Sequence, residues 1–239
     1  SDLLDCMKDR FAVAQEPSAS QDAVHTALAW SWDQLTEDHR TALAQCAVFR
    51  GPWTFAAMVD VLAVPGESSV LELAQALVNA SLLLVEHTDE GTRYRLPVLV
   101  AEWVRGRSAA PDAIQRHAAH YAGHGPADPD CMLLRRAGEL DRLGPELDNL
   151  VGAAHRATDP GHAVRAGLAA CRVYELRGPY RAALELLASV GARTDVTGPL
   201  RGLLELHAGV LHQRAGHPAD ARAALDRAEQ RLTDHRRAR

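Results

Sequence analysis

Three histidines in one short segment are spaced for possible metal chemistry. His117, His120 and His124 lie three and four residues apart, so one helix face can hold them, and histidine pairs at such spacing can bind zinc. Gly123 and Gly125 predict that the helix ends there, and cysteine and carboxylate side chains are absent beside the histidines, apart from two aspartates in the following loop. We therefore expect capping or solvated histidines and no metal.

Lysine chemistry is almost excluded, because Lys8 is the single lysine and the other 25 basic residues are arginine. A phosphate-binding loop needs Gly-Lys-Ser/Thr, whereas Met7 and Asp9 flank this lysine. Nucleophilic catalysis finds no Gly-x-Ser-x-Gly segment and no cysteine in a basic glycine turn. The paired carboxylates Asp89 and Glu90 fall in a predicted turn. We expect neither an enzyme nor a bound cofactor.

Composition is ordinary for a globular protein, with 47% apolar and 24% charged residues. The net charge of −5 is unevenly placed: residues 1–108 hold 15 acidic and 8 basic residues, a net charge of −7, and residues 109–239 a net charge of +2. No apolar run reaches the length of about 18 residues needed to span a bilayer, and the acidic start is unlike a signal peptide. The four cysteines are widely spaced, which predicts small buried thiols in a protein of the reducing cytoplasm. They are Cys6, Cys46, Cys131 and Cys171.

The elements that position these residues change character along the chain. The first half predicts helices, then a β-hairpin, then another helix, which is the order of a winged helix. Thr36 and Thr54 are predicted N-caps. Trp30, Trp32 and Trp53 are expected in the core rather than on a ligand platform. The predicted helices are 24–32, 36–48, 55–62, 70–80 and 98–104, with the hairpin at 81–96.

The second half reads as paired helices punctuated by glycine and proline, with no further strand signal. Self-comparison finds a repeat at an offset of 38 residues, in which Gly178 corresponds to Gly216 and Ala183 to Ala221. This is the tetratricopeptide pattern of about 34 residues with extra loop residues. The predicted helices are 111–121, 131–143, 145–157, 162–177, 179–190, 199–215 and 218–232.

Four regions follow from these patterns. The expected fold is mainly α, a winged-helix domain with one small β-hairpin followed by a tetratricopeptide-like α-solenoid. The regions are 1–25, the tail of a preceding helical domain with a linker; 26–108, the winged helix; 109–160, a helical connector; and 161–239, the helical repeats.

The order of segments resembles one family. The segments are Trp-Ser-Trp-Asp-Gln-Leu at 30–35, Ala-Val-Phe-Arg-Gly-Pro-Trp-Thr at 47–54, the leucine-rich run at 71–86, and Glu-Leu-Asp-Asn-Leu at 146–150. They are similar to the winged helix and tetratricopeptide-like region of bacterial signal-transduction ATPases with numerous domains, the STAND class, in the branch of AfsR-like and MalT-like regulators. Residues 3–11 resemble the end of the helical domain that precedes this winged helix.

The resemblance implies a non-catalytic, cytoplasmic regulatory fragment whose ATPase module is missing or lost. The family's Met-His-Asp triplet, whose histidine contacts nucleotide, aligns with Leu96-Pro97-Val98. Direct nucleotide sensing by this region is therefore not expected. The winged helix is expected to relay the state of an ATPase module, and a ligand on the repeats to alter docking around residues 105–121.

A DNA-binding winged-helix transcription regulator is the alternative function. The helix at 70–80 would enter the major groove, but its main polar residues are Glu72, Gln75 and Asn79, with no arginine or lysine. Arg93 and Arg95 of the predicted wing are the only nearby cations that could contact phosphates. The acidic surroundings make DNA binding the less favoured interpretation.

The repeats predict a binding face for a protein partner or small effector. In tetratricopeptide arrays the first helix of each pair lines the concave side. Three arginines there would suit an acidic peptide or a carboxylate, whereas the alternative is a set of ordinary solvated residues. The expected partner-binding residues are Arg165, Arg172, Glu175, Gln213 and Arg214, with Leu168, Leu206 and Val210 on the same face.

Overall fold

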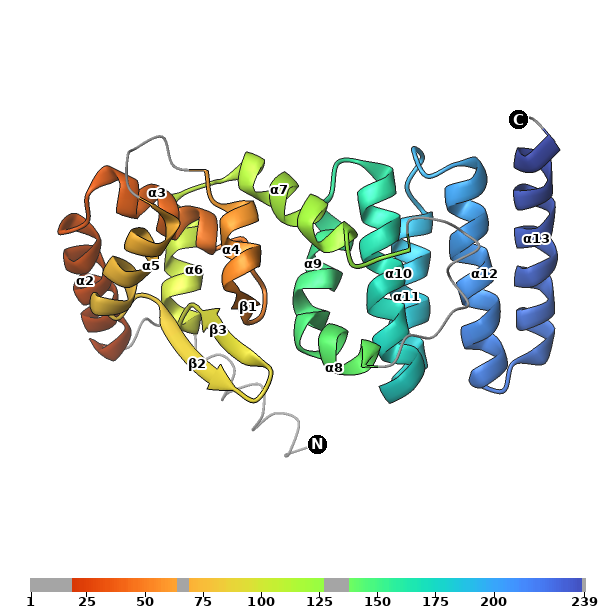
Figure 1. The fold of residues 1–239 in the computed structure, drawn as a ribbon, viewed down its shortest axis with the longest axis horizontal. Coiled ribbons are helices and arrows are strands. Elements are labelled where there is room, and N and C mark those ends of the chain that lie inside the picture. The colour runs from red at the N-terminus through yellow and green to blue at the C-terminus, as the bar shows by residue number, and fades with distance from the viewer. Residues whose placement is uncertain (1–18, 64–68, 127–137, 238–239) are drawn as a thin grey trace, which may run out of the picture.

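The computed structural model describes residues 19–63, 69–126 and 138–237 (Figure 1). Residues 19–107 form a first lobe of short helices around a small antiparallel sheet, and residues 111–237 form a second lobe in which helices stand in a row (Figure 1). The structure is therefore mainly helical with one small sheet, as the sequence predicts. The first-lobe helices are α2 (Ala19–Asp33), α3 (Glu37–Cys46), α4 (Phe55–Val61), α5 (Val70–Asn79) and α6 (Val98–Arg107).

The sheet has three strands, β1 (Trp53–Thr54), β2 (Leu84–Thr88) and β3 (Gly91–Arg95), in the order β1-β3-β2. The hairpin of β2 and β3 confirms the strand prediction at 81–96, but the expectation of a lone hairpin is wrong. Trp53 pairs with Tyr94 and Thr54 with Arg93, so β1 adds a third antiparallel strand. A two-residue strand has no alternating pattern, which explains why it escaped prediction.

Helix capping in the first lobe follows the sequence closely. Thr36 accepts a hydrogen bond from the backbone N–H of His39, and Thr54 accepts one from that of Ala57. Both predicted N-caps are confirmed. Helix α5 begins with a capping box that the sequence reading missed, in which Ser69 and Glu72 each bond the other's backbone N–H.

The second lobe is built from helices that pack on their neighbours in the row (Figure 1). Helix α7 follows directly after the first lobe and packs against α4 of that lobe as well as α9 and α10 of its own. Predictions for 1–18, and for most of the helix at 131–143, lie outside the described residues. The helices are α7 (Pro111–Ala122), α8 (Glu139–Leu143), α9 (Leu147–Arg156), α10 (Pro160–Arg177), α11 (Tyr180–Gly191), α12 (Gly198–Arg214) and α13 (Pro218–Arg237), with a 3-10 turn at Gly144–Glu146.

The two copies of the sequence repeat fold as two helix pairs, α10 with α11 and α12 with α13. Gly178 and Gly216, at equivalent positions, both have positive φ, 69° and 82°, which glycine adopts without steric cost. Ala183 and Ala221, also equivalent, are both buried. Each copy of the sequence repeat therefore contains two packed helices, with a positive-φ glycine between them.

Buried side chains form one cluster that continues from the first lobe into the second. Trp53 is buried and stacks on Phe49 with ring centroids 4.3 Å apart, while Trp32 is half-buried with its ring edge-on to Trp103. The core prediction is wrong for Trp30, which is 68% exposed. Residues that are two positions apart in a helix lie about 200° apart around its axis, so Trp30 and Trp32 cannot share the inward face of α2.

Two of the four cysteines fall within the described residues. Cys46 and Cys171 are buried thiols, as expected, and burial raises the pKa of Cys46 to about 12. Among the helices that the structure describes, none is both long and apolar enough to cross a membrane.

Candidate functional site at the junction of the two lobes

The residues expected to bind a partner divide into buried and accessible groups. Glu175 is 4% exposed, and Arg172 Nη1 donates to its Oε2 over 3.2 Å. On its other side, Glu175 Oε1 lies 3.3 Å from Nδ1 of the buried His207, which belongs to α12. Glu175 and Leu168, expected on an accessible face, therefore lie inside the helix packing.

The charge of Glu175 is balanced from several directions. Burial alone would raise its pKa, but the hydrogen bond and charge of His207, with Arg172 and Arg214 nearby, lower the pKa below its ordinary value. Glu175 therefore holds α10 and α12 together as an ionised group.

The remaining predicted residues stay at the surface. Gln213 and Arg214 are exposed near the end of α12, and Arg165 is half-buried on α10. The end of α7 approaches α10 closely, since a Cβ on Gly125 would collide with the Arg165 carbonyl group. Binding of a partner at these residues stays a prediction.

The junction brings together two of the segments that carry the family resemblance, 47–54 and 146–150. Asn149 of α9 is fully buried, and its Oδ1 accepts hydrogen bonds from the backbone N–H of Arg50 at 2.8 Å and of Gly51 at 3.2 Å. Its Nδ2 donates to the Pro52 carbonyl at 2.9 Å. One side chain thus satisfies three backbone groups of the loop between α3 and β1.

Glu146 lies one turn before Asn149. Its side chain links the sheet and α7 to the start of α9. Its side chain is 6% exposed, and its Oε1 lies 2.7 Å from Arg93 Nη1 of β3. Its Oε2 accepts a hydrogen bond from the hydroxyl of Tyr121 at 2.9 Å. Burial and the neighbouring Glu146 charge raise the pKa of Tyr121, which keeps the phenol protonated as a donor.

Two arginines close over the C-terminal end of α3. Arg105 of α6 donates to the carbonyl groups of Ala47 and Phe49, both at 2.8 Å. Arg156 of α9 donates to the Val48 carbonyl at 2.7 Å. A helix end leaves carbonyl groups unpaired and carries partial negative charge, so guanidinium groups suit it. Lysine could not replace them equally, because its ammonium lacks the planar set of donors.

The same arginines are crowded with like charge. Burial, then the charges of Arg50 and Arg105, lower the pKa of Arg156 to about 10. Burial and the charge of Arg50 also lower the pKa of Arg105. The hydrogen bonds that these arginines donate to carbonyl groups offset the repulsion between their charges.

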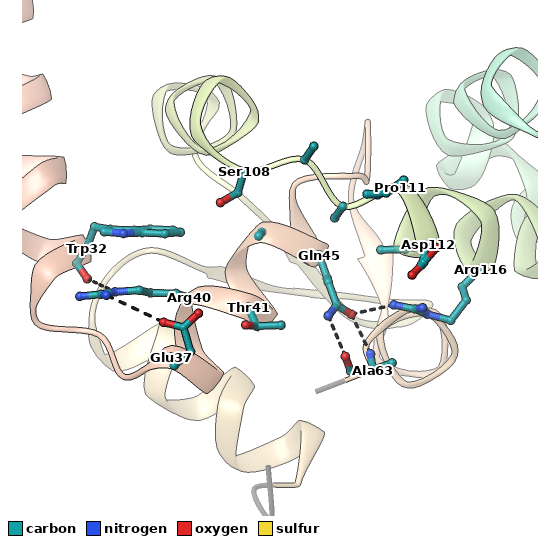
Figure 2. A pocket seen from close by; sticks show the side chains of 14 residues that line it. Trp32, Glu37, Arg40, Thr41, Gln45, Ala63, Ser108, Pro111, Asp112 and Arg116 are labelled. Atoms are coloured by element: carbon teal, nitrogen blue, oxygen red, sulfur yellow. Dashed lines mark hydrogen bonds and ion pairs between the residues drawn. The ribbon is translucent and has the colours of Figure 1, made fainter. Parts of the chain in front are cut away.

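A second set of contacts fixes the first half of α7 (Figure 2). Gln45 of α3 exchanges two hydrogen bonds with the backbone of Ala63, at 2.7 and 2.8 Å. Arg116 of α7 donates to Gln45 Oε1 at 2.9 Å and to the Val61 carbonyl at 2.7 Å. Helix α7 is thereby tied to the end of α4 as well as to the second lobe.

The histidines of α7 contribute to the junction. His117 is fully buried between Phe49 and Tyr121, so the expectation of a solvated or capping residue is wrong for it. Burial, then the charge of Arg156, lower its pKa to about 3. His120 Nδ1 lies 2.7 Å from Asp60 Oδ2. Within the described ranges, no three histidine, cysteine or acidic side chains are grouped to hold a metal.

Sequence reasoning singled out both junction segments but could not place them together. Asn149 bonds Gly51 across 98 residues of chain. Two features were available as signals: an amide next to a carboxylate in the 146–150 segment, and glycine with proline after α3.

Comparison with known proteins finds mycobacterial relatives. The chain is 30% identical over 174 residues to "Putative HTH-type transcriptional regulator Rv0890c" of Mycobacterium tuberculosis (strain H37Rv) and, with the same values, to Mb0914c of Mycobacterium bovis, which carries the same description. The match covers 69% of this chain and 19% of each relative, so the chain spans about a fifth of the length of these curated relatives. No family model and no solved structure matches the chain.

We expect Asn149→Ala to lower the free energy of unfolding by about 2–4 kcal/mol, because three part-buried backbone groups of the loop lose their fully buried partner. Chemical denaturation measures this change. Asn79→Ala, at an exposed position ending α5, is the matched control and is expected to change stability by less than about 0.5 kcal/mol. Equal effects of the two substitutions would contradict the role assigned to Asn149.

His117 predicts a particular pH dependence of stability. Its folded pKa of about 3 lies below the ordinary value of 6.5, so between these values the unfolded chain binds a proton that the folded chain excludes. Its contribution is present above pH 6.5 and is lost as pH falls toward 3, with a slope approaching about 1.4 kcal/mol per pH unit. Denaturation between pH 7.5 and 4.5 is expected to show this slope in the wild type and in His217→Leu, an exposed control. The slope is expected to shrink in His117→Leu, and an unchanged slope there would refute the assignment.

Proposed function

We propose that this chain is a non-catalytic regulatory part of a larger signalling protein of the STAND class, in the AfsR-like and MalT-like branch. The first lobe is assigned as a winged helix and the second as a tetratricopeptide-like array. Support comes from the element order of the first lobe, the two equivalent helix pairs, the resemblance of four segments, and the regulator names of the relatives.

The proposed mechanism is mechanical relay through the junction. Asn149 carries this proposal, because one buried amide fixes the loop after α3 to the first turns of α9. A ligand that reorients helices of the second lobe would move this loop, and with it the sheet and α6. Coupling of this kind needs two packed units with a shared, discrete interface.

The proposed ligand-binding part is the second lobe, with a protein partner or small effector at the accessible residues Arg165, Gln213 and Arg214. The proposed cellular place is the cytoplasm, and the proposed receiver of the signal is the ATPase module of the parent protein. Catalysis and a resident cofactor have no part in this proposal.

The test adds the purified chain to its cognate ATPase module and follows release of a fluorescent nucleotide. The wild type and Asn79→Ala are expected to change the exchange rate by the same factor. Asn149→Ala, checked for folding by circular dichroism, is expected to change it severalfold less. An exchange rate that the saturating wild-type chain leaves unchanged would refute the relay.

A DNA-binding transcription regulator is the second candidate, favoured by the printed names of the relatives. The first lobe supplies little positive charge for it. Helix α5 holds no arginine or lysine, Arg93 is paired with Glu146, and Arg95 with Glu86. Because phosphate contacts provide most non-specific affinity, a neutralised wing is poorly suited to duplex DNA.

Fluorescence anisotropy with duplex DNA separates the two candidates. We expect no binding by the chain even at low salt. Salt-dependent binding at physiological ionic strength would instead favour the transcription regulator, and loss of that binding in Arg95→Gln would place the contact on the wing.

A further inference from the structure

A cavity of about 570 Å³ lies where the two lobes are connected (Figure 2). One face of α3 forms one side, through Glu37 and the residues three, four and seven positions after it, Arg40, Thr41 and Ala44. The connector 108–110 and the first turn of α7 form another side, and Trp32 lies at one end (Figure 2). The volume suits a small molecule, and pockets between structural units are common ligand sites.

Several lining side chains are already held in place. Arg40 donates to the carbonyl groups of Trp32 and Asp33, at 3.0 and 3.1 Å, and Arg116 donates to Gln45 and Val61. These contacts fix the side chains of Arg40 and Arg116 before anything binds. A preformed site avoids the cost of ordering side chains on binding.

Other polar groups of the cavity are uncommitted. The hydroxyl groups of Thr41 and Ser108 and the carboxylate of Asp112 make no hydrogen bond or ion pair within the part of the chain that the structure describes. Asp112 and Arg116 are one helical turn apart, yet Arg116 turns away to Val61 and Gln45. The Asp112 carboxylate is therefore available to a ligand.

The charges of the lining select a class of ligand. Glu37 and Asp112 supply two negative charges, and Arg40 and Arg116 supply two positive charges; Glu37 Oε2 and Arg40 Nη1 lie 4.0 Å apart as an ion pair, so within the described residues Asp112 is the unpaired carboxylate of the lining (Figure 2). A ligand with a single charge would be attracted by one pair and repelled by the other, whereas a zwitterion can satisfy both. Trp32 adds an aromatic surface, with the Arg40 guanidinium 5.9 Å from its ring centroid.

We propose that this cavity binds a small zwitterion of the α-amino acid class. The ammonium group of the ligand pairs with Asp112, and the hydroxyl groups of Thr41 and Ser108 provide hydrogen bonds. The carboxylate group faces the arginine side chains, and the ligand's own side chain packs against Trp32 and Ala44. An occupant bridges α3 and the connector to α7, so it sets how the lobes are joined; this regulatory meaning rests on the proposed function, whereas binding does not.

The test screens the twenty L-amino acids one at a time, at millimolar concentration, for a rise in the Tm of the chain, followed by titration calorimetry. At least one is expected to bind. Its decarboxylated amine and its deaminated carboxylic acid, each lacking one charge, are expected to bind at least tenfold more weakly. Absence of binding by all twenty, or equal binding of a singly charged analogue, would overturn the proposal.

Variants locate the binding. Asp112→Asn, an isosteric change at an exposed position, is expected to weaken binding about tenfold or more, because a charge-assisted contact is lost. Thr41→Val is expected to weaken it severalfold. Asp226→Asn, the same substitution at an exposed position of α13, serves as the control and is expected to leave affinity unchanged. Unchanged affinity in Asp112→Asn would place the ligand elsewhere and refute this site.

The nucleotide-exchange assay keeps the two proposals separate. Binding that depends on Asp112 without any effect on exchange supports the site and contradicts its regulatory role. A relay that works in the absence of any amino-acid binding supports the proposed function and overturns the ligand site.

Discussion

The arrangement of this molecule depends on the need to satisfy the backbone between α3 and β1. The chain leaves α3 through the buried residues 47–49, turns at the half-buried Gly51 and Pro52, and enters the sheet at the buried Trp53. The second lobe covers part of this backbone, and a covered N–H or carbonyl group destabilises the fold if it is left unpaired. Asn149 accepts hydrogen bonds from two backbone N–H groups of the loop and donates one to a loop carbonyl group. Arg105 and Arg156 donate hydrogen bonds to the carbonyl groups at the end of α3, just before the loop. The two lobes share one core because the backbone around this loop takes its hydrogen-bond partners from both of them.

Arginine use follows from the same constraint. Arg105, Arg116 and Arg156 donate to backbone carbonyl groups, and Arg93 pairs with a buried carboxylate. These side chains act as internal connectors with several donors each, a task for which lysine is poorly shaped. The presence of one lysine among 26 basic residues therefore suits a junction that depends on arginine contacts to backbone carbonyl groups. At the junction the arginine side chains point inward and are already paired. Few of them are therefore available to contact phosphate groups of DNA.

Local elements were the most predictable part of the molecule. Threonine caps, the hairpin and the paired helices all arise from interactions within a few residues, and those are visible in sequence. Strand β1 was missed because its two residues have no period of their own, and it exists only through pairing with β3. Trp30 and His117 were misplaced for a related reason, since burial depends on which face of a helix packs against another element. The sequence shows both segments of the Asn149 contact with residues 50–52 but not that they meet, because the side chain bonds backbone that is about 98 residues away along the chain.

That mode of recognition has an evolutionary consequence. The amide of Asn149 bonds the backbone of the loop and none of its side chains. The choice of residue is therefore more constrained at position 149 than along the loop. The contact with Asn149 places no demand on the side chains of residues 50 and 52, whereas position 149 needs an acceptor and a donor on one short side chain. Proteins built on this plan are therefore free to diverge along the loop's outer surface while keeping the same way of joining their two halves.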